Sequence, residues 1–156
     1  DVRMQNEVHL PTTLHTPHIR DEYLDFIHRT KTSHFGFNID FGTFQYKAAK
    51  GMEDMAWLNF DDITKPEEIV DFLPYSYVCH AKFTYMNENF EEETIPYPEV
   101  IKLMVDNGWS GDLLSEYEGG IRFHAEEGPD KFAQAMVEIP EQVRRHQIML
   151  RNILGY

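Results

Sequence analysis

The sequence alternates four times between a short segment with the features of a β-strand and a longer segment with the features of a helix. The expected strands cover residues 2–9, 35–40, 75–83 and 111–118. Pro17, Pro66 and Pro98 stand at the start of the three helical segments between them, where the missing N–H of proline breaks no helical hydrogen bond. Strands that alternate with helices predict an α/β protein with a parallel sheet covered by helices.

The chain ends in a fourth helical segment, which is expected from Pro129 onward. We expect Pro140 to interrupt this helix, because proline in a helix interior removes a backbone hydrogen bond. A doubly wound sheet and a barrel both fit four strand–helix units. In either fold, ligands bind at the carboxyl ends of the strands, so the polar residues at those ends matter most.

Each expected strand finishes in two polar residues that are two positions apart. These pairs are Glu7 with His9, Asn38 with Asp40, His80 with Lys82, and Glu116 with Glu118. Residues two apart on a strand face the same way, so the two side chains of a pair share one side of the sheet. Neighbouring carboxylates repel each other unless a cation or a proton lies between them. The pairs therefore predict a ligand site at one edge of the sheet.

One residue from each pair would place three carboxylates and one imidazole around a single point. Hard oxygen ligands with one nitrogen suit Mn²⁺, Mg²⁺ or Co²⁺ better than a metal that prefers thiolates. We expect Mn²⁺ as the cofactor, with Mg²⁺ or Co²⁺ as alternatives. A divalent cation would also offset the repulsion between Glu116 and Glu118, the closest pair of carboxylates among the strand ends.

The composition excludes several classes of function. The chain has 14 Lys and Arg residues against 27 Asp and Glu residues, and its formal charge of −13 repels the phosphates of nucleic acids. Cys79 is the only cysteine, so no intramolecular disulfide is possible and we expect a cytoplasmic protein. No apolar run approaches the length of a membrane helix, which predicts no membrane association.

The strand ends resemble those of the xylose-isomerase-like TIM barrels, the sugar (phosphate) isomerase/epimerase superfamily. The resemblance rests on Glu7 to His9, Asn38 to Asp40, His80 to Lys82 and Ser115 to Gly119. The segment from Glu141 to Leu150 is similar to the final helix of that group, so the resemblance covers essentially the whole chain. It implies one domain over residues 1–156, in which four βα units form the C-terminal half of a (β/α)8 TIM barrel.

The resemblance also implies roles for individual residues. In that family, Glu, Asp, His and Glu from the last four strands hold a divalent metal, which corresponds here to Glu7, Asp40, His80 and Glu116. Glu7 and Glu116 would also act as base and acid on either side of a sugar. His9 and Lys82 would bind the substrate, and Glu118 ranks second to Glu116 as the ligand from the last strand.

The implied function is a metal-dependent sugar isomerase or epimerase that abstracts a proton α to a carbonyl. Sugar epimerases of the group often carry a histidine where this chain has Thr43, and the interval from Asp40 to His80 is long. These departures leave two alternatives. One is the large subunit of the C-glycoside deglycosylases, which resemble these barrels and cleave oxidised C-glycosides by a lyase reaction. The other is a non-catalytic half-barrel subunit.

The long interval contains several aromatic and sulfur-containing side chains. They include Phe44, Tyr46, Met52, Met55 and Trp57. They suit either an aromatic part of a glycoside substrate or, as the more common arrangement, packing in the outer layer of the protein.

Four βα units form only half of a barrel, because a complete one needs eight units and about 250 residues. We expect the N-terminal half to be absent from this sequence or supplied by another chain. The expected partners are a sugar or glycoside substrate and either copies of this chain, in a homo-oligomer, or a complementary half-barrel chain. Alone, the sheet would have two exposed edges and an apolar interior face.

Overall fold

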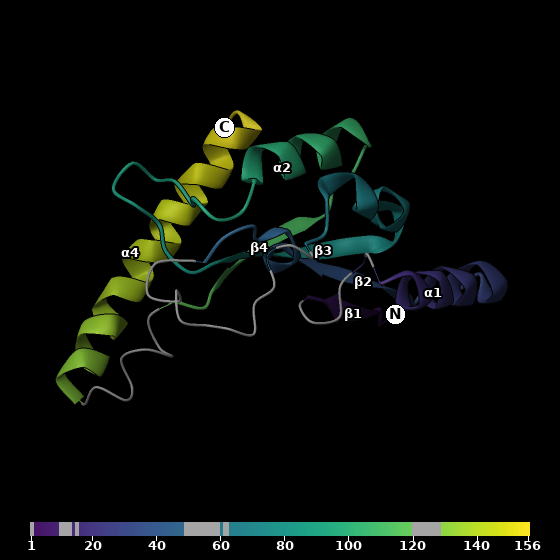
Figure 1. The fold of residues 1–156 in the computed structure, drawn as a ribbon, viewed down its shortest axis with the longest axis horizontal. Helices are drawn as coiled ribbons and strands as arrows, with labels where there is room; N and C mark the ends of the chain where they lie inside the picture. Colours follow the sequence, from purple (N-terminus) through teal and green to yellow (C-terminus); the bar gives the residue numbers. More distant parts are fainter. Residues whose placement is uncertain (1, 10–13, 15, 49–59, 61–62, 120–128) are drawn as a thin grey trace.

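Four strands form one parallel sheet in the computed structural model, which describes residues 2–9, 14, 16–48, 60, 63–119 and 129–156 (Figure 1). The strands are β1 (Met4–Val8), β2 (Phe35–Asp40), β3 (Ser76–Phe83) and β4 (Asp112–Tyr117). Their order in the sheet is their order in the sequence. The predicted α/β class with a parallel sheet is therefore confirmed, and the four strands lack the reversal of order that defines a doubly wound sheet.

Helical segments connect and follow the strands. They are α1 (Pro17–Thr30), the 3-10 helices η1 (Phe41–Phe44) and η2 (Pro66–Tyr75), α2 (Tyr97–Asp106) and α4 (Pro129–Leu154). Right-handed crossovers between sequential parallel strands place their helices on one face of a sheet. In agreement, η2 contacts β2 and β3, and α4 contacts β4. No described helix combines the length and the apolar character needed to cross a bilayer.

The hydrophobic core lies between the sheet and these helices. Phe37, Ile39 and Phe83 are fully buried on the helix-facing side of the strands, where they join Phe72 of η2 and Val100 of α2. Because side chains alternate along a strand, the residues between them point to the opposite face. The expected apolar interior face is therefore wrong for this part of the sheet.

The face opposite the helices is largely polar because alternation places the strand-end pairs there. Its members include Gln5, Glu7, Asn38, Asp40, His80, Lys82 and Glu116. The apolar residues that alternate with them along the same strands are buried in the core on the other side. Polar side chains at the carboxyl ends of parallel strands stand where α/β folds bind polar ligands.

An irregularity between β2 and β3 sets the alignment of the strand ends. The pairing register shifts between Phe37 and Asn38, and the Gln5 side chain reaches from β1 across β2 to accept hydrogen bonds from the backbone N–H groups of Tyr77 (3.0 Å) and Val78 (3.2 Å). The register partner of Gln5 in β2 is Gly36. Beyond the shift, Asp40 lies opposite His80.

Helix α4 continues through Pro140 without the interruption that the sequence predicted. Proline removes one hydrogen bond and tends to bend the helix, but here Pro140 is exposed and the turns that follow are held to the protein. The Gln142 side chain accepts a hydrogen bond from the backbone N–H of Met86 (2.6 Å) and donates one to the backbone oxygen of Met86 (3.3 Å). These tertiary contacts outweigh the single missing bond.

His146 is the buried polar anchor of α4. Its imidazole is fully buried and stacks on Phe83, with ring centroids 4.1 Å apart and an angle of 6° between the rings. Burial lowers the pKa of His146 to about 3, because an apolar environment disfavours the charged imidazolium. The side chain is therefore neutral in the folded protein at neutral pH.

The buried His146 predicts a loss of stability in acid. Below about pH 6.5 the unfolded chain binds a proton that the folded chain, with its lowered pKa, does not bind. The free energy of unfolding should thus fall as pH decreases from about 7 towards about 3, by up to about 1.4 kcal/mol per pH unit. Urea unfolding at pH 7.5 and at pH 5 measures this effect. His146→Gln should be less stable than wild type at pH 7.5, but its free energy of unfolding should fall less than that of wild type when the pH is lowered to 5. Equal losses for both proteins would contradict this.

Candidate metal centre

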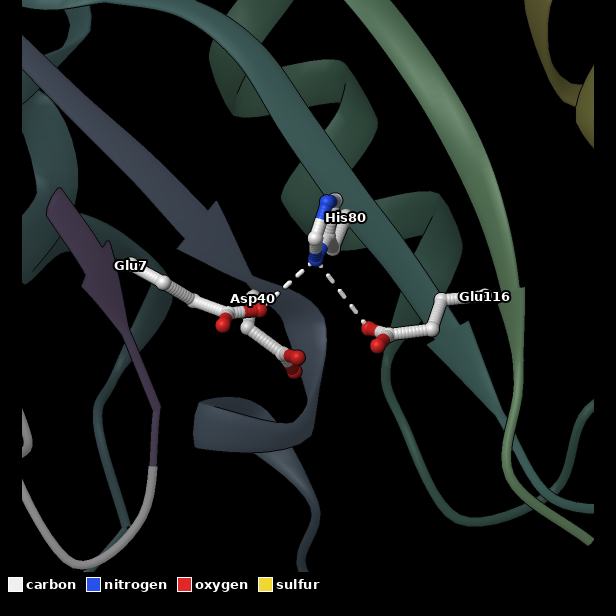
Figure 2. Close-up of side chains that lie close together, drawn as sticks. All are labelled: Glu7, Asp40, His80 and Glu116. Carbon is white, nitrogen blue, oxygen red and sulfur yellow. Dashed lines mark hydrogen bonds and ion pairs between the residues drawn. The ribbon is translucent and has the colours of Figure 1, made fainter. Parts of the chain in front are cut away.

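The carboxyl ends of the four strands bring four potential metal ligands together. Glu7, Asp40, His80 and Glu116 each offer one ligand atom, and these atoms lie within 4.8 Å of one another (Figure 2). Ligands on opposite sides of one ion with bond lengths of about 2.1 Å lie about 4.2 Å apart. The four predicted ligands therefore lie at nearly the spacing that one ion requires, while their binding of a metal stays a prediction.

His80 lies between two of the carboxylates. Its Nδ1 atom is 2.7 Å from Oε1 of Glu7 and 3.2 Å from Oε2 of Glu116. A single ring N–H points at one acceptor only, and it is directed at Glu7. The two glutamates approach this nitrogen from opposite sides, because they come from β1 and β4 (Figure 2).

Oε2 of Glu116 accepts no hydrogen bond from the residues that the structure describes. This oxygen is buried, and within the same part of the chain its contact is the 3.2 Å approach to Nδ1 of His80. A buried carboxylate oxygen that accepts no hydrogen bond is costly. A cation among the four side chains would supply the missing contact, so the residues present fit a divalent metal.

Asp40 is the most deeply buried member of the cluster. Its Oδ1 accepts a short hydrogen bond from the backbone N–H of Gly42 (2.6 Å), and its Oδ2 faces Nζ of Lys82 at 3.3 Å. Burial raises the pKa of Asp40 to about 7; Lys82 and the Gly42 N–H act in the opposite direction, and the nearby Glu116 adds to the rise. Positive charge at this position would favour the ionised carboxylate.

The position of Lys82 distinguishes Glu116, which lies in β4, from Glu118, which follows the end of β4. Its Nζ lies 3.1 Å from Oε2 of Glu118, so Glu118 forms an ion pair with Lys82 while Glu116 joins the cluster. Burial lowers the pKa of Lys82, but Asp40, Glu118 and Glu116 together raise it above its usual value. The structure therefore places a charged ammonium group beside the candidate metal site.

Two further residues singled out in the sequence lie outside the cluster. His9 is exposed and follows the end of β1, and the cluster of four does not include it. Thr43 is fully buried, with its hydroxyl 2.6 Å from that of Thr64. The position where epimerases of the family that the sequence resembles often carry a histidine thus stabilises the base of a long connection.

The aromatic segment after β2 is described only in part. Phe44 is fully buried in the hydrophobic core, in agreement with a packing role. Tyr46 is 45% exposed and its hydroxyl donates to the backbone oxygen of Glu93. Met52, Met55 and Trp57 lie outside the described residues, so the interpretation of this segment as a cover for an aromatic substrate stays a prediction.

Two supporting residues had no role in the sequence interpretation. The side-chain oxygen of Asn38 accepts a hydrogen bond from the backbone N–H of His80 (2.9 Å), and Gly42 donates to Asp40. A Cβ atom at Gly42 would lie 2.8 Å from Oδ1 of Asp40 and 2.8 Å from Cδ of Lys82. The Asp-Phe-Gly sequence at the end of β2 is a recognisable turn signal, whereas the role of Asn38 depends on the pairing of β2 with β3.

Comparison with known proteins gives partial matches. No family model matches the chain. It is 35% identical over 86 residues to the C-glycoside deglycosidase alpha subunit of Microbacterium trichothecenolyticum, which covers 51% of this chain and 23% of that protein. It is 36% identical over 61 residues to a C-glycoside deglycosidase alpha subunit of Arthrobacter globiformis, covering 39% of this chain and 17% of that protein.

A further relative carries a different name. The chain is 30% identical over 91 residues to the 3'-dehydrocarminate deglycosidase alpha subunit of a Microbacterium species, covering 58% of this chain and 23% of that protein. The matched segments thus span less than a quarter of the length of each of these relatives. All three relatives are named as alpha subunits of enzymes that act on glycosides.

The cluster predicts different effects for the two glutamates at the end of β4. In the complete protein, Glu116→Gln should weaken Mn²⁺ binding by more than about 100-fold, because losing a ligand costs more than the 10–100-fold typical of a supporting partner. Glu118→Gln has the same shape and removes the same charge, but it should weaken binding by less than about 10-fold. Calorimetric titration with Mn²⁺ measures both affinities. Equal losses would contradict the assignment of Glu116 as the ligand.

Proposed function

We propose that this chain forms the C-terminal half of a (β/α)8 barrel whose metal centre catalyses elimination on an oxidised C-glycoside. The observation that carries the proposal is the cluster of three carboxylates and one imidazole, in a chain whose relatives are named as deglycosidase alpha subunits. The sequential order of the parallel strands supports a barrel, because barrel strands follow the chain order. The expected cofactor is Mn²⁺, with Mg²⁺ or Co²⁺ as alternatives.

A ketone in the sugar explains how a carbon–carbon glycosidic bond is broken. One relative is named for a 3'-dehydro compound, in which a hydroxyl group of the sugar is oxidised to a carbonyl. The proton on the carbon between this carbonyl and the anomeric carbon is then acidic. When a base removes it, its electron pair forms a double bond to the anomeric carbon, the bond to the aglycone breaks, and the aglycone takes up a proton.

The residues of the cluster suit this reaction. A bound divalent ion would polarise the ketone and stabilise negative charge on its oxygen. Glu7 and Glu116 lie on opposite sides of His80 (Figure 2), so one carboxylate removes the proton and the other stands on the far side to deliver one. Lys82 directs its ammonium group into the same site and donates hydrogen bonds to sugar oxygens, and His9 binds the substrate at the end of β1.

Sugar isomerisation or epimerisation is the second candidate. The observation that favours it is the same pair of glutamates on either side of one centre, because a proton removed on one face would be returned on the other or to the adjacent carbon. We rank it below elimination because the named relatives are deglycosidase subunits. The burial of Thr43 against Thr64 also leaves no side chain from that position to contact a sugar.

A complete barrel requires strands beyond the four described here. We propose that the outer edges of β1 and β4 pair with the strands of an N-terminal half, from the same polypeptide or from another chain. Exposed strand edges carry unpaired backbone groups that readily accept further strands. The names of the relatives as alpha subunits support association with a second kind of subunit as well.

Substrate turnover by the complete protein tests the reaction type. With Mn²⁺ in deuterated water, an aryl C-glycoside oxidised to a ketone in its sugar should release its aglycone. Glu7→Gln and Glu116→Gln should lower the rate by about 100-fold or more, the usual contribution of a positioned acid or base. Both can be compared with Glu118→Gln, which keeps the cluster intact.

The same incubation separates the candidates. A free ketose that gains deuterium without any aglycone release would favour isomerase or epimerase chemistry instead. A protein that holds Mn²⁺ but changes neither substrate would refute proton abstraction for both substrate classes and favour a non-catalytic half-barrel subunit.

A further inference from the structure

A chain of hydrogen bonds runs behind the sheet, on the side opposite the metal cluster. It starts at Gln147 of α4, whose amide donates to the hydroxyl of Ser115 in β4. Ser115 Oγ lies 2.8 Å from Nδ1 of His146, and Nε2 of His146 lies 2.9 Å from the hydroxyl of Tyr97. The Tyr97 hydroxyl lies 2.7 Å from the backbone oxygen of Lys82 in β3.

The direction of every bond in this chain is determined by its last member. The carbonyl of Lys82 only accepts, so Tyr97 must donate its single proton there, and its oxygen accepts from Nε2–H of His146. Nδ1 of the neutral imidazole is then an acceptor, and the Ser115 hydroxyl donates to it. Each group has one arrangement that satisfies it, which makes the chain a rigid connection.

The hydrogen bonds reach the sheet at two points, Ser115 in β4 and the Lys82 carbonyl in β3, and both points adjoin residues of the metal cluster. In the parallel pairing of β3 and β4, Ala81 is opposite Ser115 and Lys82 is opposite Glu116. Adjacent residues of a strand point to opposite faces. A bond that holds Ser115 from behind therefore also holds the backbone of Glu116, and the bond to the Lys82 carbonyl holds the segment that carries His80.

The residues that form these hydrogen bonds are also buried and packed, so they resist movement. Tyr97 and His146 are 1% and 0% exposed, and His146 stacks on Phe83 at the end of β3. Tyr97 opens α2 and His146 belongs to α4, so two helices act on the two strand ends through one set of bonds. These bonds therefore connect β3 to β4 through the two helices and help to fix the positions of the two strand ends relative to each other.

We propose that Tyr97 and His146 are positioning residues of the metal centre, which hold His80 and Glu116 at the separation that a divalent ion requires. This inference rests on the proposed function, since it assumes that the cluster binds a metal. It adds a support that does not touch any of the four ligands. Groups that hydrogen-bond directly to metal ligands commonly contribute about 10–100-fold to affinity, so a support that acts through the strand backbone should contribute at the low end of that range.

Two disruptive variants, one conservative variant and a matched control test the inference in the complete protein. Tyr97→Phe deletes one oxygen and breaks the link to Lys82, and His146→Leu breaks the chain in its middle. Each should raise the Kd for Mn²⁺ by about 10-fold and change the visible absorption spectrum of bound Co²⁺. His146→Gln keeps a donor towards Tyr97 and should restore most of the affinity.

Leu150→Ala is the control, because Leu150 is a buried core residue on the same face of α4 and lies outside the chain of bonds. It should lower stability while the Kd for Mn²⁺ and the Co²⁺ spectrum stay as in wild type. If His146→Leu fails to fold, Tyr97→Phe, which retains the buried ring, decides the outcome alone.

The results distinguish this inference from the proposal on which it rests. Wild-type affinity and an unchanged Co²⁺ spectrum in Tyr97→Phe would overturn the positioning role and leave the metal centre standing. An equal loss of affinity in Leu150→Ala would also overturn it, because general destabilisation would then explain the effect. A wild-type protein that binds no Mn²⁺ would overturn the metal centre and the positioning role together.

Discussion

The mutual repulsion of three carboxylates at the strand ends is the constraint on which the rest of this structure depends. Two unit charges 4 Å apart repel by about 1 kcal/mol in water and about 4 kcal/mol at the effective dielectric of a protein surface. Three such groups share a space in which the ligand atoms lie within 4.8 Å of one another, so their repulsion opposes the folded arrangement wherever it is not offset. The ion pair of Lys82 with Asp40 relieves part of this repulsion, burial raises the pKa of Asp40 to about 7 and so favours its neutral form, and a divalent cation would offset the remainder.

A sheet can keep such a cluster only if its strands are held firmly from the other side. The helix-facing side carries the aromatic and aliphatic core, and the anchoring of α4 through His146 extends this support to the end of β3. Beside the register shift, the Gln5 side chain accepts hydrogen bonds from the backbone N–H groups of Tyr77 and Val78. The same shift puts Asp40 opposite His80, so a local irregularity of the sheet contributes directly to the geometry of the site.

The proposed reaction rests on the chemistry of the site together with the names of the relatives. Carboxylates on two sides of a divalent ion would suit the removal of a proton next to a carbonyl, and this step is shared by isomerases, epimerases and lyases. The relatives are named as deglycosidase alpha subunits, and this is the reason for proposing elimination rather than isomerisation. The ion pair of Lys82 with Glu118 adds a fixed cation that suits the oxygens of a sugar.

The sequence by itself determined the strand–helix order, the parallel sheet and the residues that gather at its carboxyl edge. These features follow from periodicity and from the alternation of side chains, which are local properties of the chain. Side-chain alternation could not separate Glu116 from Glu118, because both point to the same face. Only the family resemblance ranked Glu116 first, and the distances from His80 and Lys82 distinguish the two. It also could not show that α4 runs through Pro140, that Thr43 is buried against Thr64, or that Tyr97 and His146 reach the strand ends. Those outcomes depend on contacts between residues that are far apart in the sequence, and only the tertiary structure decides them.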